Sequence, residues 1–545
     1  MSVTMALPLI VRARHGSDGL AYLAPSSPRD TRAGDACGTS HEARMPSRTP
    51  GAGEQYRFHV DMGTCIGCKC CVVACNEQNG NPATINWRRV TDIEGGFFPQ
   101  VTQTFLSMGC NHCVDPTCLS GCPVDAYTKD AATGIVLHSA DACIGCQYCT
   151  WNCSYGVPQY NPERGVVGKC DLCHGRLADG DAPACVSACP EGALAVEIVN
   201  IEAWRTDAAA GAHAEVPFND GSLSTTRITA PSNMPPNAMP RGLLHVMPEH
   251  PHWSLVVMTV LTQFSVGGLS AIWLLHLAGT STRLGAAALA SLAVAMLALG
   301  SATLHLGRPA HAYRALRMWR RSWLSREVLL FGCFAGAAAA YALLLWLEMP
   351  GAVVAGGITA LLGVGGVTAS ACIYRVSSRP AWNTPLTLVQ FNLTAATLGP
   401  LFAGAAGLGD LRWLGVAAAT MAGLQLVLLA VRFLRCTASD APELRGTARL
   451  LSTLLAGRFV LRGVLLVAGA IVLPLLAGSF QAGPAEAGPY AYIAGPYAST
   501  AGHYAWMAAL ALALAGEVLG RYLFFVSVVP KHPAAPYLAS AREAA

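Results

Sequence analysis

The chain has 545 residues, which is too long for one ordinary hydrophobic core and suggests about three structural units. Its net charge of only +4 argues against a nucleic-acid partner, which would need a strongly basic surface. Eighteen of its 21 cysteines precede residue 190, whereas the chain from about residue 253 is mostly Ala, Leu, Val and Gly. The composition therefore predicts a cysteine-rich head followed by a membrane body.

The N-terminal segment, residues 1–54, is rich in Ala, Arg, Ser, Pro and Gly and has no hydrophobic periodicity. We expect it to be a disordered extension. Its apolar stretch MALPLIV is too short for the core of a signal peptide, and basic residues follow it rather than precede it. The segment has no twin-arginine pair near its start, so we expect no export signal.

The next segment, residues 55–200, carries sixteen cysteines in four groups. The first and third groups repeat one spacing, with two, two and three residues between successive cysteines, and the second and fourth are looser copies. The groups are Cys65, Cys68, Cys71 and Cys75; Cys110, Cys113, Cys118 and Cys122; Cys143, Cys146, Cys149 and Cys153; and Cys170, Cys173, Cys185 and Cys189.

This spacing is typical of 4Fe-4S clusters. Three thiolates on a tight loop hold three corners of a cubane, and Gly67 and Gly145 would let backbone amides approach the sulfurs. The fourth cysteine, expected to open a helix, ligates the other cluster of a pair, and Pro123 and Pro190 follow two of these cysteines as that pattern expects. Asn76 and Ser154 stand at the place of the proline in the other two groups. Cys70 falls outside the spacing.

Two other interpretations of the cysteines are weaker. Structural zinc prefers two separated pairs of ligands per site, whereas each group here has three or four closely spaced thiols. Disulfides would require an oxidising compartment, and the cluster spacing suits a reducing one. The sequence therefore predicts four 4Fe-4S clusters.

Residues 56–200 resemble the iron–sulfur subunit of the dimethyl sulfoxide reductase family, a four-cluster ferredoxin that partners molybdopterin enzymes. The matching stretches include CIGCQYC, YGVPQYNPE, GKCDLCHGRLADGDAPACVSACP and NWRRV. The resemblance implies that the first group pairs with the fourth and the second with the third. Some relatives have Trp at the position of Cys149 and hold a three-iron cluster there, so Cys149 implies four irons. The implied ligand sets are Cys65, Cys68, Cys71 and Cys189; Cys75, Cys170, Cys173 and Cys185; Cys110, Cys113, Cys118 and Cys153; and Cys122, Cys143, Cys146 and Cys149.

After the head, residues 201–250 read as a linker, because TAPSNMPPNAMPRG has the Pro and Asn content of an extended tether. Residues 251–530 then contain about eight apolar runs of roughly 20 residues, the length that crosses a bilayer. Charged faces, which a buried helix of a soluble domain would show, are lacking. The fold expected is an α+β tandem ferredoxin-like head, an all-α polytopic membrane domain and a C-terminal tail, 531–545. The runs are 253–278, 284–306, 327–348, 351–373, 385–406, 412–434, 459–479 and 504–529.

Arginines predict the orientation of these spans. The loop after the second span, GRPAHAYRALRMWRRSWLSR, has six arginines, and more follow the fourth span and lie in the loop between the sixth and seventh. With eight spans, this arginine-rich side is also the side of the head and of the C-terminus. The positive-inside rule therefore predicts a bacterial inner-membrane protein with its head in the cytoplasm.

The membrane body resembles the anchor subunit of the same reductase family. The matching residues are EHPHWSLVVMTVLTQFSVGG and TLHLGRPAHAYRALRMWRRSWLSREVLLFG, so cluster subunit and anchor appear in one polypeptide. The resemblance implies quinol oxidation without haem. The third to seventh spans contain no histidine, which agrees with that expectation because bis-histidine ligation would need one.

His305 and Glu327 are the candidate quinol residues, at the head-side ends of the second and third spans. Quinol oxidation releases two protons, and an imidazole and a carboxylate are suitable acceptors. The alternative is that Glu327 pairs with arginines of its loop and His305 caps a helix; both positions match ones that the family uses for quinol. Glu517 and Arg521, at i and i+4 in the last span, are expected to form a structural ion pair.

Together these features predict a non-catalytic electron-transfer subunit that oxidises quinol, with menaquinol expected, and sends electrons through four clusters to a separate molybdopterin subunit that reduces an S-oxide or N-oxide. One alternative runs the path in reverse, with a partner that oxidises formate or a sulfur compound. A second alternative is a non-redox membrane scaffold that binds zinc.

Overall fold

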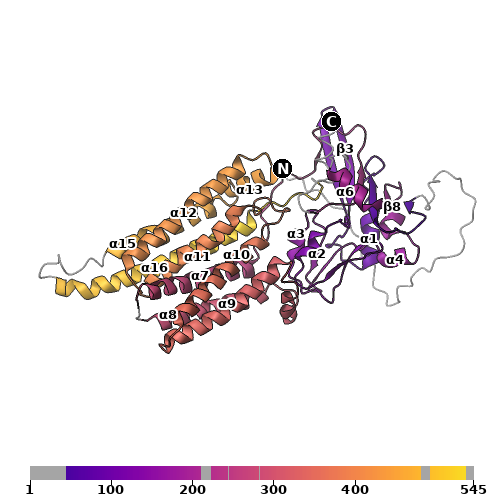
Figure 1. Ribbon diagram of the computed structural model, residues 1–545. Helices are drawn as coiled ribbons and strands as arrows, with labels where there is room; N and C mark the ends of the chain where they lie inside the picture. Colours follow the sequence, from indigo (N-terminus) through magenta and orange to yellow (C-terminus); the bar gives the residue numbers. More distant parts are fainter. Residues whose placement is uncertain (1–43, 210–221, 244, 281–282, 480–490, 535–545) are drawn as a thin grey trace, which may run out of the picture. The chain divides into compact units, whose positions relative to one another are not determined.

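The computed structural model describes residues 44–209, 222–243, 245–280, 283–479 and 491–534. Within this part of the chain, strands and short helices form the head, and long helices follow it (Figure 1). Residues 1–43 of the expected N-terminal extension and 535–545 of the expected tail lie outside the described residues. Arg44 already contacts the head, since its Nη1 donates to the Cys189 carbonyl at 2.7 Å.

Two small sheets form the frame of the head. In the first, strand β1 pairs antiparallel with β8 and parallel with β9; in the second, β2 pairs antiparallel with β3 and with β10. Alternate residues of β1, such as Phe58 and Val60, are buried, as expected for strands with one face on a core. The strands are β1 (Glu54–Asp61), β2 (Arg89–Phe97), β3 (Gln100–Met108), β8 (Leu194–Asn200), β9 (Arg227–Thr229) and β10 (Met239–Pro240).

The segment expected as a linker contributes β9 and β10, one to each sheet, so its extended backbone lies on the head. Its first residues form helix α6 (Ile201–Ala209). Extended segments rich in Pro and Asn suit sheet edges, where they need few ladder hydrogen bonds. Two short hairpins complete the strands of the head: β4 (Tyr127–Lys129) with β5 (Val136–His138), and β6 (Gln159–Asn161) with β7 (Val166–Gly168).

Eight helices of the described residues are long and apolar enough to cross a membrane, which confirms the eight predicted spans. The seventh span is built from α14 (Ala456–Leu466), a π-helical turn η3 (Val467–Val472) and α15 (Leu473–Ser479). The other spans are α7 (Trp253–Leu277), α8 (Leu284–Thr303), α9 (Trp323–Trp346), α10 (Ala352–Ile373), α11 (Pro385–Ala405), α12 (Leu411–Thr437) and α16 (Ala491–Val526).

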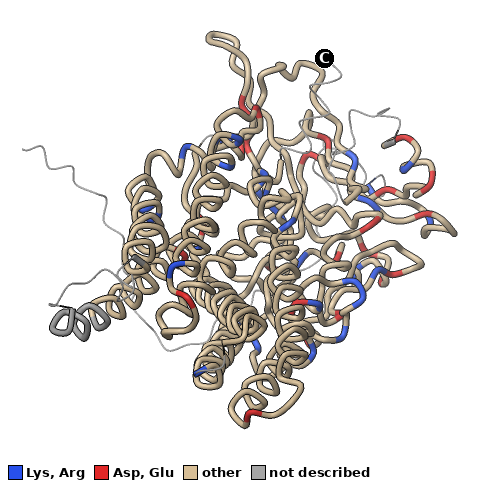
Figure 2. The backbone as a smooth tube through the Cα atoms, turned by 60° about the vertical axis from the view of Figure 1, so that its left-hand side comes forward, with Lys and Arg blue, Asp and Glu red and all other residues tan. Residues whose placement is uncertain are grey.

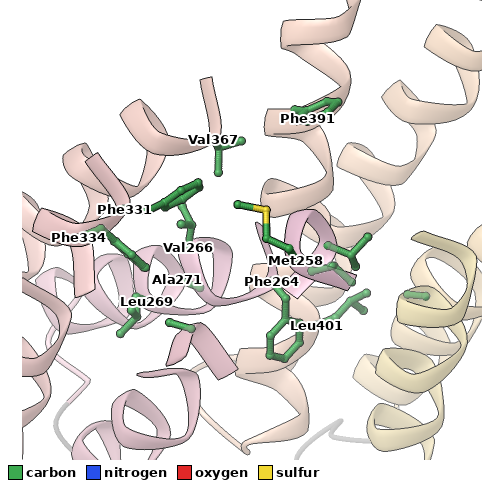
Figure 3. Packing of buried hydrophobic residues seen from close by; sticks show 14 of the residues in the cluster. Met258, Phe264, Val266, Leu269, Ala271, Phe331, Phe334, Val367, Phe391 and Leu401 are labelled. Carbon is green, nitrogen blue, oxygen red and sulfur yellow. The ribbon is translucent and has the colours of Figure 1, made fainter. Parts of the chain in front are cut away.

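Helix α7 is the central helix, because 78% of its apolar window is buried against other parts of the structure. Figure 3 shows its side chains Met258 and Phe264 among residues of α9, α10 and α11. Gly267 faces Gly399 of α11 closely enough that a Cβ at Gly267 would lie 2.1 Å from the Ala395 carbonyl oxygen. Small residues thus let the two backbones approach, the usual way that helices associate in lipid.

The head rests on two loops of the helical part. The loop between α8 and α9, which holds the 3-10 helix η2 (Pro309–Leu316), binds the head through Arg308 Nη1 to the Ala140 carbonyl at 2.8 Å and Ser322 Oγ to the Gly121 carbonyl at 2.7 Å. Ser378, between α10 and α11, donates to the Trp151 carbonyl. Figure 2 shows that Lys, Arg, Asp and Glu are sparse along the long helices compared with the head. The arginine-rich loop is therefore on the side of the head.

Candidate functional site

Two loops of the head repeat the same backbone geometry. Gly67 and Gly145 have φ of 71° and 69°, and Lys69 and Gln147, two residues further on, have φ of 62° and 60°. Each left-handed pair folds the chain into a tight loop just before a helix, α1 (Cys70–Asn79) or α3 (Tyr148–Asn152). A Cβ at Gly67 would lie 2.5 Å from Phe105 Cδ1, so the position needs glycine.

The position of the fourth cysteine differs from the expectation. It was expected to open a helix, but Cys75 lies inside α1, Cys122 follows α2 (Thr117–Gly121) and Cys153 follows α3. The third cysteine of the first and third groups occupies the first helical turn instead. The tight loop uses the left-handed residue as the helix N-cap, so the helix starts one position before the third cysteine.

The thiols gather into four sites, each with three cysteines of one group and one of another. We call them site 1 to site 4. Members of each site lie close enough to interact electrostatically, and these contacts reproduce the sets that the family resemblance implied. The members are Cys65, Cys68, Cys71 and Cys189 at site 1; Cys75, Cys170, Cys173 and Cys185 at site 2; Cys110, Cys113, Cys118 and Cys153 at site 3; and Cys122, Cys143, Cys146 and Cys149 at site 4.

The thiols of two sites line cavities. All four cysteines of site 1 line one cavity, and all four of site 3 line another. No group of three or more His, Cys, Asp or Glu in the part of the chain that the structure describes is arranged to hold a single metal ion. Backbone amides point at the sulfurs, with Gly145 N 3.4 Å from Cys143 Sγ and Ala126 N 3.4 Å from Cys122 Sγ. Cavities lined by four thiols, as at sites 1 and 3, and amide donors to sulfur, as at site 4, both suit a 4Fe-4S cluster, so the residues fit that group.

Burial alone would keep these thiols protonated, because it raises the pKa of Cys146 and of Cys185 to about 12. Thiolate ligands in such surroundings need positive charge close by. Arg88 supplies part of it: the side chain is buried, with 1% exposed, and its guanidinium lies 4.4 Å from the centre of the Phe58 ring. Its Nη1 donates to Ser107 Oγ at 3.0 Å, and Ser107 Oγ is 3.4 Å from Cys71 Sγ.

The spatial order of the four sites follows from three residues, each of which lies near the thiols of two sites. Tyr127 lies near thiols of sites 4 and 3. Lys169, which is buried, lies near thiols of sites 3 and 2, with its Nζ 3.8 Å from Cys110 Sγ. Arg88 lies near thiols of sites 2 and 1. The sites therefore follow one another in the spatial order 4, 3, 2, 1.

Site 4 faces the helical part. Gly145 meets Gly307 of the loop after α8 so closely that a Cβ at Gly145 would lie 2.9 Å from Gly307 Cα. Tyr148, next to Cys149, is near Cys146 on one side and Glu327 of α9 on the other. Glu327 is 6% exposed, and Tyr374 also lies near it. The predicted residue Glu327 is thus at the contact between α9 and the head.

His305 lies on the same boundary but is not in contact with Glu327 through any hydrogen bond or ion pair found among the described residues. Its electrostatic neighbour is His252, the residue just before α7. The His252 ring packs edge-on against Trp151 of α3, with 5.4 Å between ring centres. Burial lowers the pKa of His305 to about 4, so its imidazole is neutral at pH 7. Glu327 is therefore near helix α3 at Tyr148, whereas His305 is near His252, which packs against Trp151 of the same helix.

Glu517 and Arg521 do not form the expected direct ion pair. Glu517 accepts hydrogen bonds from Thr394 Oγ1 at 2.9 Å and Gln425 Nε2 at 2.7 Å. Arg521 Nη2 donates to Gln263 Oε1 at 2.8 Å, and the guanidinium lies 3.6 Å from the Phe391 ring centre. Its Nε and Nη1 have no hydrogen-bond partner among the described residues. The neighbouring helices supply these partners, and a sequence pattern within one helix does not reveal them.

Three site residues were missed by the sequence interpretation: Tyr148, Trp151 and His252. Tyr148 lies in CIGCQYC and His252 in EHPHWSLVVMTVLTQFSVGG, two stretches that marked the family, and Trp151 lies two residues after the first of them. The signal was present, because aromatic residues beside cluster cysteines have no counterpart in the first group. Only the contact of the head with the helices gives them a role.

Comparisons with known proteins agree with this architecture. Residues 101–198 match a family described as a 4Fe-4S dicluster domain, and residues 247–437 match the DMSO reductase anchor subunit. The probable anaerobic dimethyl sulfoxide reductase chain YnfG of Escherichia coli (strain K12) is 41% identical over 148 residues, 26% of this chain and 72% of that relative. The B subunit of the anaerobic dimethyl sulfoxide reductase of Haemophilus influenzae is 39% identical over 150 residues, 26% of this chain and 73% of that relative. The iron–sulfur subunit of formate dehydrogenase-O from Escherichia coli (strain K12) is 38% identical over 160 residues, 26% of this chain and 52% of that relative.

A cysteine-rich ferredoxin-like head joined to eight apolar helices defines a membrane-anchored iron–sulfur electron-transfer subunit. The matches to the head and to the helical part together identify the family. The protein belongs to the dimethyl sulfoxide reductase family and unites its iron–sulfur subunit with its membrane anchor in one polypeptide.

Proposed function

We propose that this protein oxidises a membrane quinol, menaquinol being the expected donor, at the boundary between helices and head. Electrons then pass through four 4Fe-4S clusters at sites 4, 3, 2 and 1 to a separate molybdopterin subunit that reduces an S-oxide or N-oxide. The proposal takes the sixteen cysteines named above as the cluster ligands and assigns the five segments 1–54, 55–200, 201–250, 251–530 and 531–545 as extension, head, linker, anchor and tail.

The observation that carries the proposal is the position of site 4. Tyr148 lies near Cys146 of this site and near the carboxyl group of Glu327, so a quinol at this boundary would lie beside the first electron acceptor. The clusters would supply one-electron carriers, whereas quinol gives up two electrons and two protons. The remaining chemistry is proton acceptance, which falls to side chains of this protein.

Glu327 and His305 are the proposed proton acceptors. The His305 imidazole is neutral at pH 7, because burial lowers its pKa to about 4. A neutral ring nitrogen can accept the proton of a quinol hydroxyl, and because so weak a base does not keep the proton, His305 would pass it on. A buried carboxyl group such as that of Glu327 can do the same when its charge lacks a partner. Tyr148 and His252 would position the quinol ring between them, since both are polar-tipped rings at this boundary.

Electrons would leave at site 1. Cys68 is exposed there, and the apolar side chains of Ile66 and Val73 are 56% and 60% exposed beside it. Exposed apolar residues around a cofactor suit a docking surface for a partner subunit. The path therefore runs from the membrane boundary to the far surface of the head.

The reverse direction is the second candidate, favoured by the similarity to the formate dehydrogenase-O subunit. The test uses the tagged protein, purified anaerobically with whatever partner accompanies it. We expect a molybdopterin protein in the preparation, and dithionite-reduced clusters that are reoxidised by dimethyl sulfoxide or trimethylamine N-oxide. Reduction of the clusters by formate, with no reoxidation by either oxide, would establish the reverse direction instead.

The head is proposed to be cytoplasmic, on the arginine-rich side of the membrane. A reporter enzyme that is active only in the periplasm should therefore be silent when fused after Ala545 and active when inserted near Gly488, between the seventh and eighth spans. Both positions lie outside the described residues. The opposite pattern of activity would place the head in the periplasm.

A further inference from the structure

A partly open cavity lies at the head-side ends of α11, α12, α14 and α16, and neither the cysteines of site 4 nor His305 and Glu327 line it. Helix α13 (Pro442–Ser452) contributes Thr447 and Leu451 to its wall. Arg432 is five residues before the end of α12, and Arg462 is six residues after the start of α14. At about 1.5 Å per residue, both lie roughly 8–9 Å along their helices from the head-side ends.

Arg432 and Arg462 both line this cavity and give its wall positive charge. Arg462 is buried, with 4% exposed, and its Nε has no hydrogen-bond partner among the residues that the structure describes. Gly520 makes room for it, since a Cβ there would lie 2.4 Å from Arg462 Nε. Arg432 donates to the carbonyl of Ala381 at 2.9 Å and to Gln390 Oε1, and it lies near Arg462.

The positive charge exceeds the negative charge around the cavity. Arg432, Arg462 and Arg521 interact with one another, and Glu517 is the carboxylate found near them among the described residues. Glu517 already accepts hydrogen bonds from Thr394 and Gln425. Uncompensated arginine charge inside a membrane domain is costly, so an anion in the cavity would stabilise it.

Most of the rest of the wall is apolar, with Leu428, Phe433, Phe459 and Leu523 among its residues. Its uncharged polar members are Gln390, Gln425, Thr447 and Ser527. Cations at the membrane boundary with apolar walls beside them suit a ligand that has an anionic head and a hydrocarbon chain. The arginines of α13 and the exposed Arg458 add positive charge to the head-side surface, which attracts anionic lipid. A quinol ring is neutral and would leave the charge uncompensated.

We propose that this cavity, lined by Arg432 and Arg462 of α12 and α14, binds the phosphate group of an anionic phospholipid, with one acyl chain along Leu428 and Phe459. The site is separate from the proposed quinol site and goes beyond the proposed function. The bound lipid would hold the last spans, α14 to α16, against α12. Arginine–phosphate contacts are strong because the hydrogen bonds are charge-assisted.

The test measures lipid binding to the intact complex, purified in a mild non-ionic detergent and stripped of loosely bound lipid. Phosphatidylglycerol in mixed micelles should raise the melting temperature, whereas phosphatidylcholine and inorganic phosphate should not. The double variant Arg432→Gln/Arg462→Gln should bind phosphatidylglycerol at least about tenfold more weakly. The matched control is Arg435→Gln, which removes an exposed arginine on α12 outside the cavity wall and should bind normally.

A second variant tests the same site without changing its charge, and so controls for misfolding of the double variant. Leu428→Trp fills the apolar part of the cavity and keeps both arginines, so it should also lose the response to phosphatidylglycerol while iron content stays normal. Equal responses to inorganic phosphate and phosphatidylglycerol would overturn the lipid assignment, as would a response to a menaquinone analogue alone. Normal lipid binding by the double variant would overturn the site itself.

Discussion

His305→Ala and Glu327→Gln are each expected to slow the reduction of the clusters by a quinol analogue roughly 100-fold or more. Each substitution removes a proposed proton acceptor at the boundary with the head, and a positioned acid–base group typically contributes that much to a rate. The clusters should remain assembled and reducible by dithionite, because neither side chain belongs to a thiol site. The measurement is the rate of cluster bleaching after mixing with the quinol analogue under anaerobic conditions.

Matched controls are available on the same side of the membrane. His311→Ala changes a histidine in the same loop, and Glu443→Gln changes a carboxyl group that is 7% exposed on α13, much like Glu327 at 6%. Both variants should reduce their clusters at a normal rate. Should Glu517→Gln with Arg521→Leu stop quinol oxidation while His305→Ala does not, the quinol site lies deeper among the helices.

Cys149→Ser is expected to lower the iron content by about one atom per chain and to leave a three-iron cluster at site 4. Serine is a poorer ligand for iron than a thiolate, and the other three cysteines of the site remain. The variant should keep three normal clusters, and its altered cluster should give a distinct electron paramagnetic resonance signal. Quinol should then reduce the head more slowly, because site 4 lies against the helices.

Cys70→Ser is the matched control for this experiment. Cys70 is exposed, next to Cys71 in sequence and outside the four thiol sites. Its iron and sulfide contents should equal those of the unmodified protein. Loss of a whole cluster from this variant would show that the ligands of site 1 or site 2 are wrongly assigned.

Spacing and hydropathy predicted much of this molecule because they reflect local physics. A loop with two left-handed residues precedes α1 and α3, and Gly67 and Gly145 mark it in the sequence. A span needs about 20 apolar residues whatever its neighbours are, so all eight could be predicted from one sequence. The family resemblance, and not the spacing, predicted which cysteines share a site. Spacing alone does not show which group supplies the fourth cysteine of a site.

Contacts between distant segments could not be predicted. The roles of Tyr148 and His252 depend on how α3 rests against the helices, and the aromatic residues near them in sequence do not reveal which helix they contact. The order of the four sites was found from Tyr127, Lys169 and Arg88, single side chains that each lie near the thiols of two sites. Glu517 found partners on α11 and α12 rather than Arg521 four residues away, because buried polar groups take the nearest donors in three dimensions.

The central claim is that the head carries four 4Fe-4S clusters, and the most direct test is the metal and sulfide content of the anaerobically purified protein. Four cubanes predict about sixteen iron atoms and about sixteen acid-labile sulfides per chain. Zinc without iron or sulfide would contradict the account and would favour a zinc-binding membrane scaffold.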